Sequence, residues 1–113
     1  FLRNIFYNKN LTLKREFIDY FYETMETSHN LLFISRLTAL ASQFILTNQL
    51  PKIKNEVLII WGVNDKIVPL HKNQKYFTLL PNSQVKIIEE AGHVPSLEKS
   101  HEFNDTVLEF LVI

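Results

Sequence analysis

The stretch that decides the fold is residues 57–65, which read Val57-Leu58-Ile59-Ile60-Trp61-Gly62-Val63-Asn64-Asp65. Its first five residues are continuously apolar and rich in β-branched side chains, and a glycine and an Asn-Asp pair follow soon after. A short apolar run bounded by turn residues predicts a β-strand that is covered on both faces. The glycine lets the backbone leave the strand sharply, so that the short carboxylate of Asp65 points across the end of the sheet.

A second run further along the chain has the same plan. Residues 85–95 read Val85-Lys86-Ile87-Ile88-Glu89-Glu90-Ala91-Gly92-His93-Val94-Pro95. Residues 85–90 predict a second strand, and residues 71–80 predict a helix between the two strands. Strand, helix and strand joined by short loops predict a parallel pair, whose C-terminal ends lie at the same edge of the sheet. Asp65 and His93 are therefore expected side by side at that edge, where open α/β sheets carry their ligands.

A carboxylate beside an imidazole has a specific use in catalysis. The carboxylate accepts a hydrogen bond from one ring nitrogen, which fixes the tautomer and stabilises the imidazolium, and the other ring nitrogen is free to act as a general base. Asp65 and His93 are thus candidate catalytic residues. Each also has a plainer interpretation, Asp65 as a turn residue and His93 as an ordinary loop histidine. Their occurrence together after consecutive strands favours the catalytic interpretation.

The remaining segments are predicted to be helical, because their apolar residues recur at helical spacing. Thr12 and Asn30 are candidate caps of two helices near the N-terminus, and Ser100 is a candidate cap of a C-terminal helix. The expected inward faces of the three helices are, in turn, Leu13, Phe17, Tyr20, Phe21 and Met25; Leu37, Leu40, Ala41 and Phe44; and Phe103, Val107, Phe110 and Leu111. The chain therefore divides into a helical segment, residues 1–51, and a βαβα unit, residues 52–113.

Length and composition limit the function classes. The 113 residues suffice for one ordinary domain, and an apolar content of 46% indicates a packed core. Twelve basic residues balance twelve acidic ones, which argues against a nucleic-acid partner. The apolar runs are far shorter than the roughly 20 residues that a membrane span needs. The sequence begins at Phe1 rather than at a methionine, and we interpret it as the C-terminal portion of a longer protein.

Residues 53–111 resemble the α/β-hydrolase family. The likeness is carried by Leu58-Ile59-Ile60-Trp61-Gly62-Val63-Asn64-Asp65-Lys66-Ile67-Val68-Pro69, Leu80-Pro81-Asn82-Ser83, Ala91-Gly92-His93-Val94-Pro95-Ser96-Leu97-Glu98 and Glu102-Phe103. The resemblance implies an α/β fold in which residues 52–113 form the C-terminal part of the hydrolase core. Residues 1–51 resemble the family's helical cap domain more loosely.

The same resemblance implies a catalytic triad with Asp65 as the acid and His93 as the base. The implied activity is hydrolysis of an ester, amide or C–C bond in a small-molecule substrate, with no cofactor. A cytoplasmic location is also implied.

The nucleophile of such a triad is not present in this sequence. The family's nucleophile elbow, Gly-x-Ser-x-Gly, needs two glycines around a strained turn, and none of the six serines has such neighbours. We therefore expect the nucleophile upstream, and no hydrolysis by these 113 residues alone. Two alternatives stay open: an Asp nucleophile, as in epoxide hydrolases and haloalkane dehalogenases, or a non-catalytic ligand-binding module or pseudoenzyme on the same scaffold.

Other residues near the site are weaker candidates. Trp61, Val63 and Val94 flank the candidate acid and base and are predicted to line the substrate pocket, although Trp61 equally suits the core. Ser96 is interpreted as a loop or helix-cap hydroxyl rather than a nucleophile. The remaining histidines, which are expected to face water, are His29, His71 and His101. No recognisable ligand spacing indicates a metal site.

Overall fold

The computed structural model describes residues 2–12, 14–25, 28–41 and 46–112. In chain order its elements are α1 (Leu2–Ile5), α2 (Lys9–Thr12), α3 (Arg15–Met25), α4 (Ser28–Ala41), a 3-10 helix (Leu50–Lys52), β1 (Val57–Gly62), α5 (Leu70–Phe77), β2 (Ser83–Ile88), α6 (Pro95–Glu98) and α7 (Ser100–Leu111). Helices thus precede a βαβα unit, as the sequence predicts. Among the residues described, none of the helices combines the length and the apolar character that a bilayer crossing needs.

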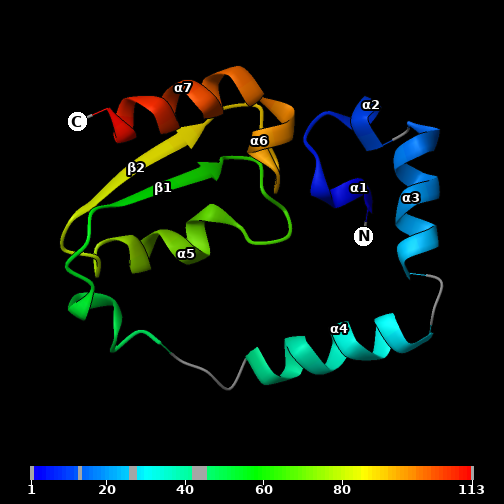
Figure 1. The fold of residues 1–113 in the computed structure, drawn as a ribbon, viewed down its shortest axis with the longest axis horizontal. Helices are drawn as coiled ribbons and strands as arrows, with labels where there is room; N and C mark the ends of the chain where they lie inside the picture. Colours follow the sequence, from blue (N-terminus) through cyan, green and yellow to red (C-terminus); the bar gives the residue numbers. More distant parts are fainter. Residues whose placement is uncertain (1, 13, 26–27, 42–45, 113) are drawn as a thin grey trace.

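The two strands form a parallel pair, which confirms the predicted pairing. Val57 lies opposite Ser83 and Gly62 lies opposite Ile88, so both strands end at the same edge. Helices α5 and α7 lie on opposite sides of the sheet (Figure 1). The apolar residues of β1 are only half-buried, because a sheet of two strands shields little of its surface.

The observed bounds differ from the predicted ones in the second half of the chain. Strand β2 begins two residues before Val85 and ends at Ile88, because the backbone turns at Glu90, which has a φ of 52°. Helix α5 begins at Leu70 and ends at Phe77, three residues before the predicted end. Helix α7 begins at Ser100 itself, with Lys99 in the capping position, so the predicted Ser100 cap was wrong.

The N-terminal helices also begin at other residues than predicted. Helix α3 begins at Arg15 rather than directly after Thr12, whose side chain lies outside the described residues. Helix α4 begins at Ser28, so Asn30 lies inside its first turn and does not cap it. The Nδ2 of Asn30 instead donates to the carbonyl oxygen of Thr24, 2.6 Å away, and links α4 to the end of α3.

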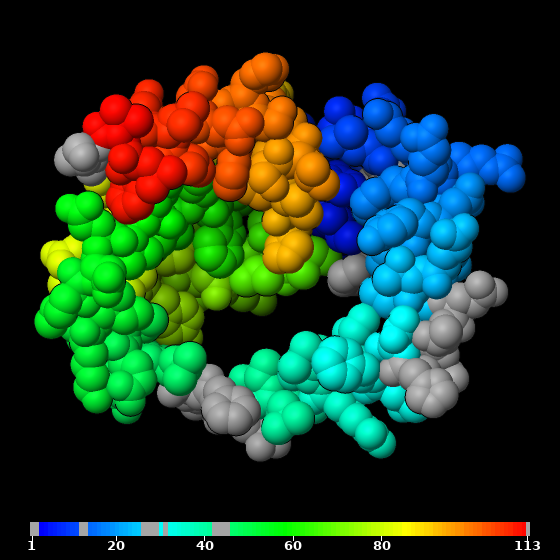
Figure 2. Space-filling view, in the orientation of Figure 1, coloured from blue at the N-terminus to red at the C-terminus, as the bar shows by residue number. Residues whose placement is uncertain are grey.

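Several predicted inward faces are exposed. Tyr20, Leu37, Leu40 and Leu111 are each at least half exposed, so their prediction as buried residues was wrong, and Ala41 is exposed as well. Leu13 and Phe44 lie outside the described residues. Figure 2 shows why α4 differs: it lies apart from α5 across an open gap. Helical spacing tells which residues share a face, but not whether another element covers that face.

The buried residues gather where the strands end. Among the residues described, the buried apolar side chains are Phe6, Ile88 and Ala91, and the buried polar side chain is Asp65. Phe6 lies between α1 and α2, and its ring meets that of Phe17 in α3 edge to face, at 5.2 Å between centroids. The N-terminal segment also contacts the loop that follows β2, because the N–H of His93 donates to the carbonyl oxygen of Ile5.

Candidate active site

The loop after β1 holds Asp65 in a buried position. The residue is 7% exposed, and its Oδ1 accepts hydrogen bonds from the backbone N–H groups of Ile67 and Val68, each at 2.8 Å. An aspartate that accepts bonds from residues two and three positions further on closes a tight local turn. These two bonds fix the direction of the carboxylate and leave Oδ2 free for another partner.

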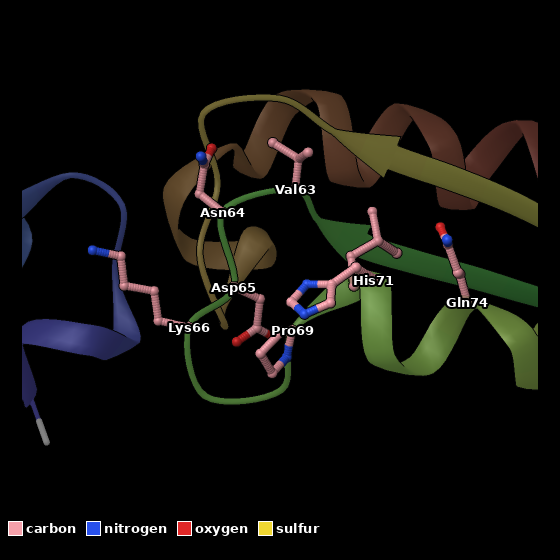
Figure 3. Close-up of a pocket in the computed structure, with 8 residues that line it drawn as sticks. Val63, Asn64, Asp65, Lys66, Pro69, His71 and Gln74 are labelled. Carbon is pink, nitrogen blue, oxygen red and sulfur yellow. The ribbon is translucent and has the colours of Figure 1, made fainter.

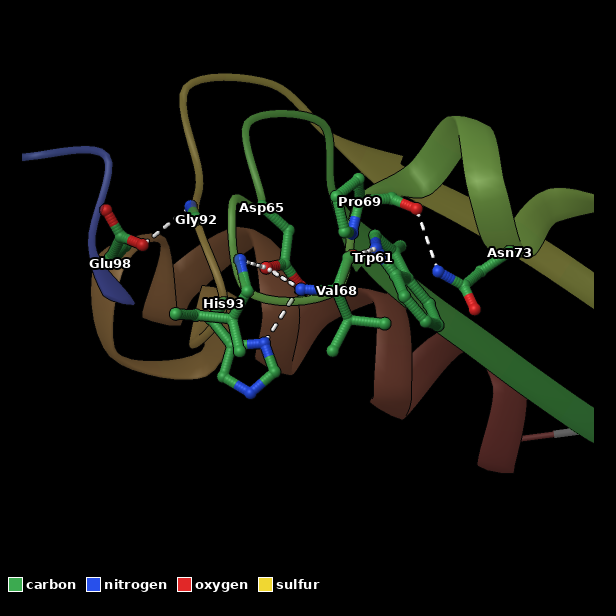
Figure 4. Close-up of polar contacts among 9 residues, drawn as sticks. Trp61, Asp65, Val68, Pro69, Asn73, Gly92, His93 and Glu98 are labelled. Carbon is green, nitrogen blue, oxygen red and sulfur yellow. Dashed lines mark hydrogen bonds and ion pairs between the residues drawn. The ribbon is translucent and has the colours of Figure 1, made fainter. Parts of the chain in front are cut away.

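That partner is His93, as the sequence predicts. Its Nδ1 lies 2.9 Å from Oδ2 of Asp65 (Figure 4). A carboxylate oxygen only accepts hydrogen bonds, so Nδ1 carries the proton and donates it. The other ring nitrogen, Nε2, is left unprotonated in the neutral imidazole and can accept a proton. The imidazole is 40% exposed while the carboxylate is 5% exposed, so the pair has a buried acid and an accessible base.

Backbone hydrogen bonds hold the two loops together. Val63 N–H donates to the carbonyl of Ile88 at 3.0 Å, and Asn64 N–H donates to that of Ala91 at 2.9 Å. His93 N–H donates to the carbonyl of Ile5 at 2.7 Å. This bond connects the loop of residues 89–94, which we call the histidine loop, to the N-terminal segment. The relative position of the acid and the base thus depends on main-chain contacts beyond the sheet.

Both glycines matter through close contact rather than through unusual backbone angles. Neither has a positive φ. A Cβ on Gly62 would collide with the carbonyl oxygen of Gly92 and would lie 2.5 Å from that of Ala91. A Cβ on Gly92 would lie 2.5 Å from the carbonyl oxygen of Ile5. The glycines therefore let three backbone segments approach each other at the site, whereas the sequence suggested freedom to turn at Gly62.

Replacing Gly62 by Ala is expected to destabilise the protein by about 3 kcal/mol, because the added methyl group meets rigid backbone of the histidine loop. The free energy of unfolding in urea, measured on the complete protein, tests this. Gln84→Ala is the control: Gln84 is exposed on β2, so its loss is expected to change stability by less than about 0.5 kcal/mol. Equal stability of the two variants would contradict the close-contact role of Gly62.

The predicted pocket residues lie around the pair. Trp61 lines a cleft together with Val68, His93 and Pro95. Its indole also packs on the ring of Phe77, and its Nε1 donates to the carbonyl of Val68 at 3.1 Å, so Trp61 has a structural role as well.

A neighbouring open pocket includes Val63, Asn64, Lys66 and His71 in its lining (Figure 3). Val94 is half-buried at the start of α6. Contact of Trp61, Val63 or Val94 with a substrate stays a prediction.

The other side chains of interest lie outside the pair. His71 and His101 are exposed, as predicted, and the side chain of His29 lies outside the described residues. Ser96 is half-buried within α6. In the part of the chain that the structure describes, no group of three or more His, Asp or Glu residues could hold a metal ion.

Sequence reasoning missed the role of Glu98. Its carboxylate accepts hydrogen bonds from the backbone N–H groups of Gly92, Tyr7 and Asn8. A signal was available, because a lone acidic residue follows His93 by five positions, at the end of the helical turn that Pro95 begins. The partners were not predictable, because two of them lie about 90 residues away in the sequence.

Comparison with known proteins decides the family. A family model described as "alpha/beta hydrolase fold" matches residues 2–100. The chain belongs to the α/β-hydrolase-fold family. Among the curated relatives, a 2-hydroxy-6-oxononadienedioate/2-hydroxy-6-oxononatrienedioate hydrolase from Burkholderia vietnamiensis is 32% identical over 96% of this chain, and hydrolase 2 of that name from Pseudomonas putida is 30% identical over 97%. The chain spans 38–40% of the length of these two relatives.

Solved structures agree with this assignment. The α/β-hydrolase enzyme MGS-MChE2, from a sediment metagenome of the Mar Chica lagoon, superposes with a TM-score of 0.72 at 30% identity, over 85% of this chain and 44% of the other. MGS-M2, from a Medee basin deep-sea metagenome, has a TM-score of 0.79 at 25% identity, over 99% of this chain and 42% of the other. The fold is therefore the C-terminal part of an α/β hydrolase, as the sequence predicts.

Proposed function

We propose that the complete protein containing this chain is a hydrolase in which His93 is the general base and Asp65 orients it. The observation that carries the proposal is the 2.9 Å contact between a buried carboxylate and an accessible imidazole. The resemblance of residues 53–111 to the family's acid and histidine loops supports it. The nucleophile is expected outside these 113 residues, because no Gly-x-Ser-x-Gly occurs in them.

The geometry supports proton transfer to and from Nε2 of His93. Nε2 of His93 takes the proton of the nucleophile's hydroxyl as that oxygen attacks the substrate carbonyl, and Nδ1–H stays bonded to Asp65. The imidazolium formed in this step is stabilised by the buried carboxylate. The same Nε2–H then gives its proton to the leaving group, which departs and leaves the acyl group bonded to the nucleophile. Nε2 next takes a proton from a water molecule as the water oxygen attacks this acyl group, and it returns that proton to the nucleophile's oxygen as the acid product is released.

We propose a keto acid as the substrate, cleaved at a C–C bond. The curated relatives are named for hydroxy-oxo dienedioates and trienedioates, and these names contain hydroxyl, keto and carboxylate groups but no ester or amide. Hydrolysis of such a compound has to break a carbon–carbon bond, and the bond beside the ketone is the one that nucleophilic attack weakens. Residues 1–51 are proposed as part of a cap over the pocket, which the bond between His93 and Ile5 supports. A cytoplasmic location stays a prediction from the resemblance.

A substrate panel tests the proposed function on the complete protein. It contains 2-hydroxy-6-oxononadienedioate, a p-nitrophenyl ester and a p-nitroanilide, and the change in absorbance follows the hydrolysis of each compound. We expect kcat/KM to be highest for the keto acid. A preference for the ester would show that the proposed substrate class is wrong, and it would leave the proposed roles of Asp65 and His93 unaffected. Absence of hydrolysis with every compound would favour the non-catalytic alternative. The residue at the nucleophile elbow, read from the complete sequence, distinguishes a serine from an aspartate nucleophile.

A further inference from the structure

We propose that Glu98 is a positioning residue for His93. Its carboxylate binds the backbone of the histidine loop and the backbone of residues 7–8 at the same time, and so holds the imidazole against Asp65. The kinetic test of this inference rests on the proposed function, because it measures turnover. A second test measures the His93–Asp65 hydrogen bond directly and does not depend on turnover.

The two oxygens of Glu98 have different partners. Oε1 accepts from the N–H of Gly92 at 2.6 Å (Figure 4), whereas Oε2 accepts from the N–H groups of Tyr7 at 2.7 Å and Asn8 at 3.0 Å. A carboxylate is purely an acceptor, so it matches three donors that point at it from two segments. Hydrogen bonds to an ionised acceptor are short and roughly twice as strong as neutral ones.

The segments that Glu98 joins are also in direct contact. The carbonyl of Ile5 accepts from the N–H of His93, and a Cβ on Gly92 would lie 2.8 Å from the nitrogen of Tyr7. The backbone of residues 92 and 93 is thus held both by the carbonyl of Ile5 and by the carboxylate of Glu98. The imidazole is 40% exposed, so its position depends strongly on this backbone and on Asp65.

A glutamine at position 98 has the shape of glutamate but only one acceptor oxygen. Its NH₂ group would face either the N–H of Gly92 or the N–H groups of Tyr7 and Asn8, and donors facing donors repel each other. Either orientation loosens one of the two segments. The expected consequence is a shift of the His93 backbone with the fold retained.

The experiment compares Glu98→Gln with Glu102→Gln in the complete protein. Glu102 lies exposed on α7 and pairs with Lys86 at 2.9 Å. Glu102→Gln therefore also removes one negative charge, but at a site outside the histidine loop. We expect Glu98→Gln to lower kcat by about 10- to 100-fold, with KM changed less than about twofold, because misplacing a base affects the reaction more than binding. Glu102→Gln is expected to leave both unchanged.

The second readout is the downfield proton resonance of the His93 Nδ1–H···Asp65 hydrogen bond in the NMR spectrum. Glu98→Gln is expected to shift or broaden it, and Glu102→Gln is expected to leave it as in the wild type. If Glu98→Gln does not fold, Glu98→Asp, which keeps the charge on a shorter side chain, is measured by the same criteria.

The outcomes separate this inference from the proposed function. A changed resonance together with a lower kcat supports the positioning role. A changed resonance in a protein that hydrolyses no substrate also supports it, while the proposed function fails. An unchanged resonance overturns the positioning role whatever the activity, and so does an activity loss that merely follows the fraction of unfolded protein.

Discussion

Replacement of His93 by Ala in the complete protein is expected to lower kcat by about 10⁴- to 10⁶-fold, with KM changed less than about threefold. In the proposed function the imidazole accepts the nucleophile's proton, and the methyl group of alanine cannot do so. The residual rate would come from groups that bind the substrate and stabilise the oxyanion. Steady-state kinetics on the best substrate of the panel measures both constants.

The matched control is His101→Ala, because His101 is an exposed histidine in the first turn of α7. We expect its kinetic constants to equal those of the wild type. Thermal unfolding of both variants checks that the His93 variant is folded, which its exposed imidazole favours. A His93 variant that keeps more than a tenth of the wild-type kcat would refute the role of general base.

The second large effect is expected for Asp65→Asn, which should lower kcat by about 10⁴-fold with little change in KM. The backbone donors around position 65 determine the orientation of the asparagine side-chain amide. The N–H groups of Ile67 and Val68 both point at the position of Oδ1, so the amide oxygen has to occupy it. The NH₂ group then faces Nδ1 of His93, which must become an acceptor, and the ring proton moves to Nε2. A histidine in that tautomer cannot accept the nucleophile's proton.

Asp105→Asn is the control for this variant, because Asp105 is an exposed aspartate on α7. It is expected to leave kcat and KM unchanged. Asparagine is preferable to alanine at position 65, since alanine would leave two backbone donors of the turn without their acceptor. An unchanged rate in Asp65→Asn would show that the acid of the triad lies on another strand.

The parts of the fold that could be predicted depend on short-range patterns. The apolar run ending at Gly62 and the run ending near Ile88 were sufficient to predict two parallel strands. The end of β2 was mispredicted, because the positive φ of Glu90 has no distinctive local signal. In α4, Leu37 and Leu40 share a face as predicted, yet they are exposed, because coverage of a face depends on elements distant in the sequence.

The sequence by itself determined that a carboxylate and an imidazole follow consecutive parallel strands, and hence that Asp65 and His93 meet at one edge of the sheet. Strand direction and loop length are local properties, which explains why this much was accessible. Only the tertiary structure decided that Gly62 and Gly92 serve close backbone contact and that Glu98 joins the histidine loop to residues 7–8. Those contacts connect segments far apart in the chain, so they arise from packing rather than from any local preference of the residues involved.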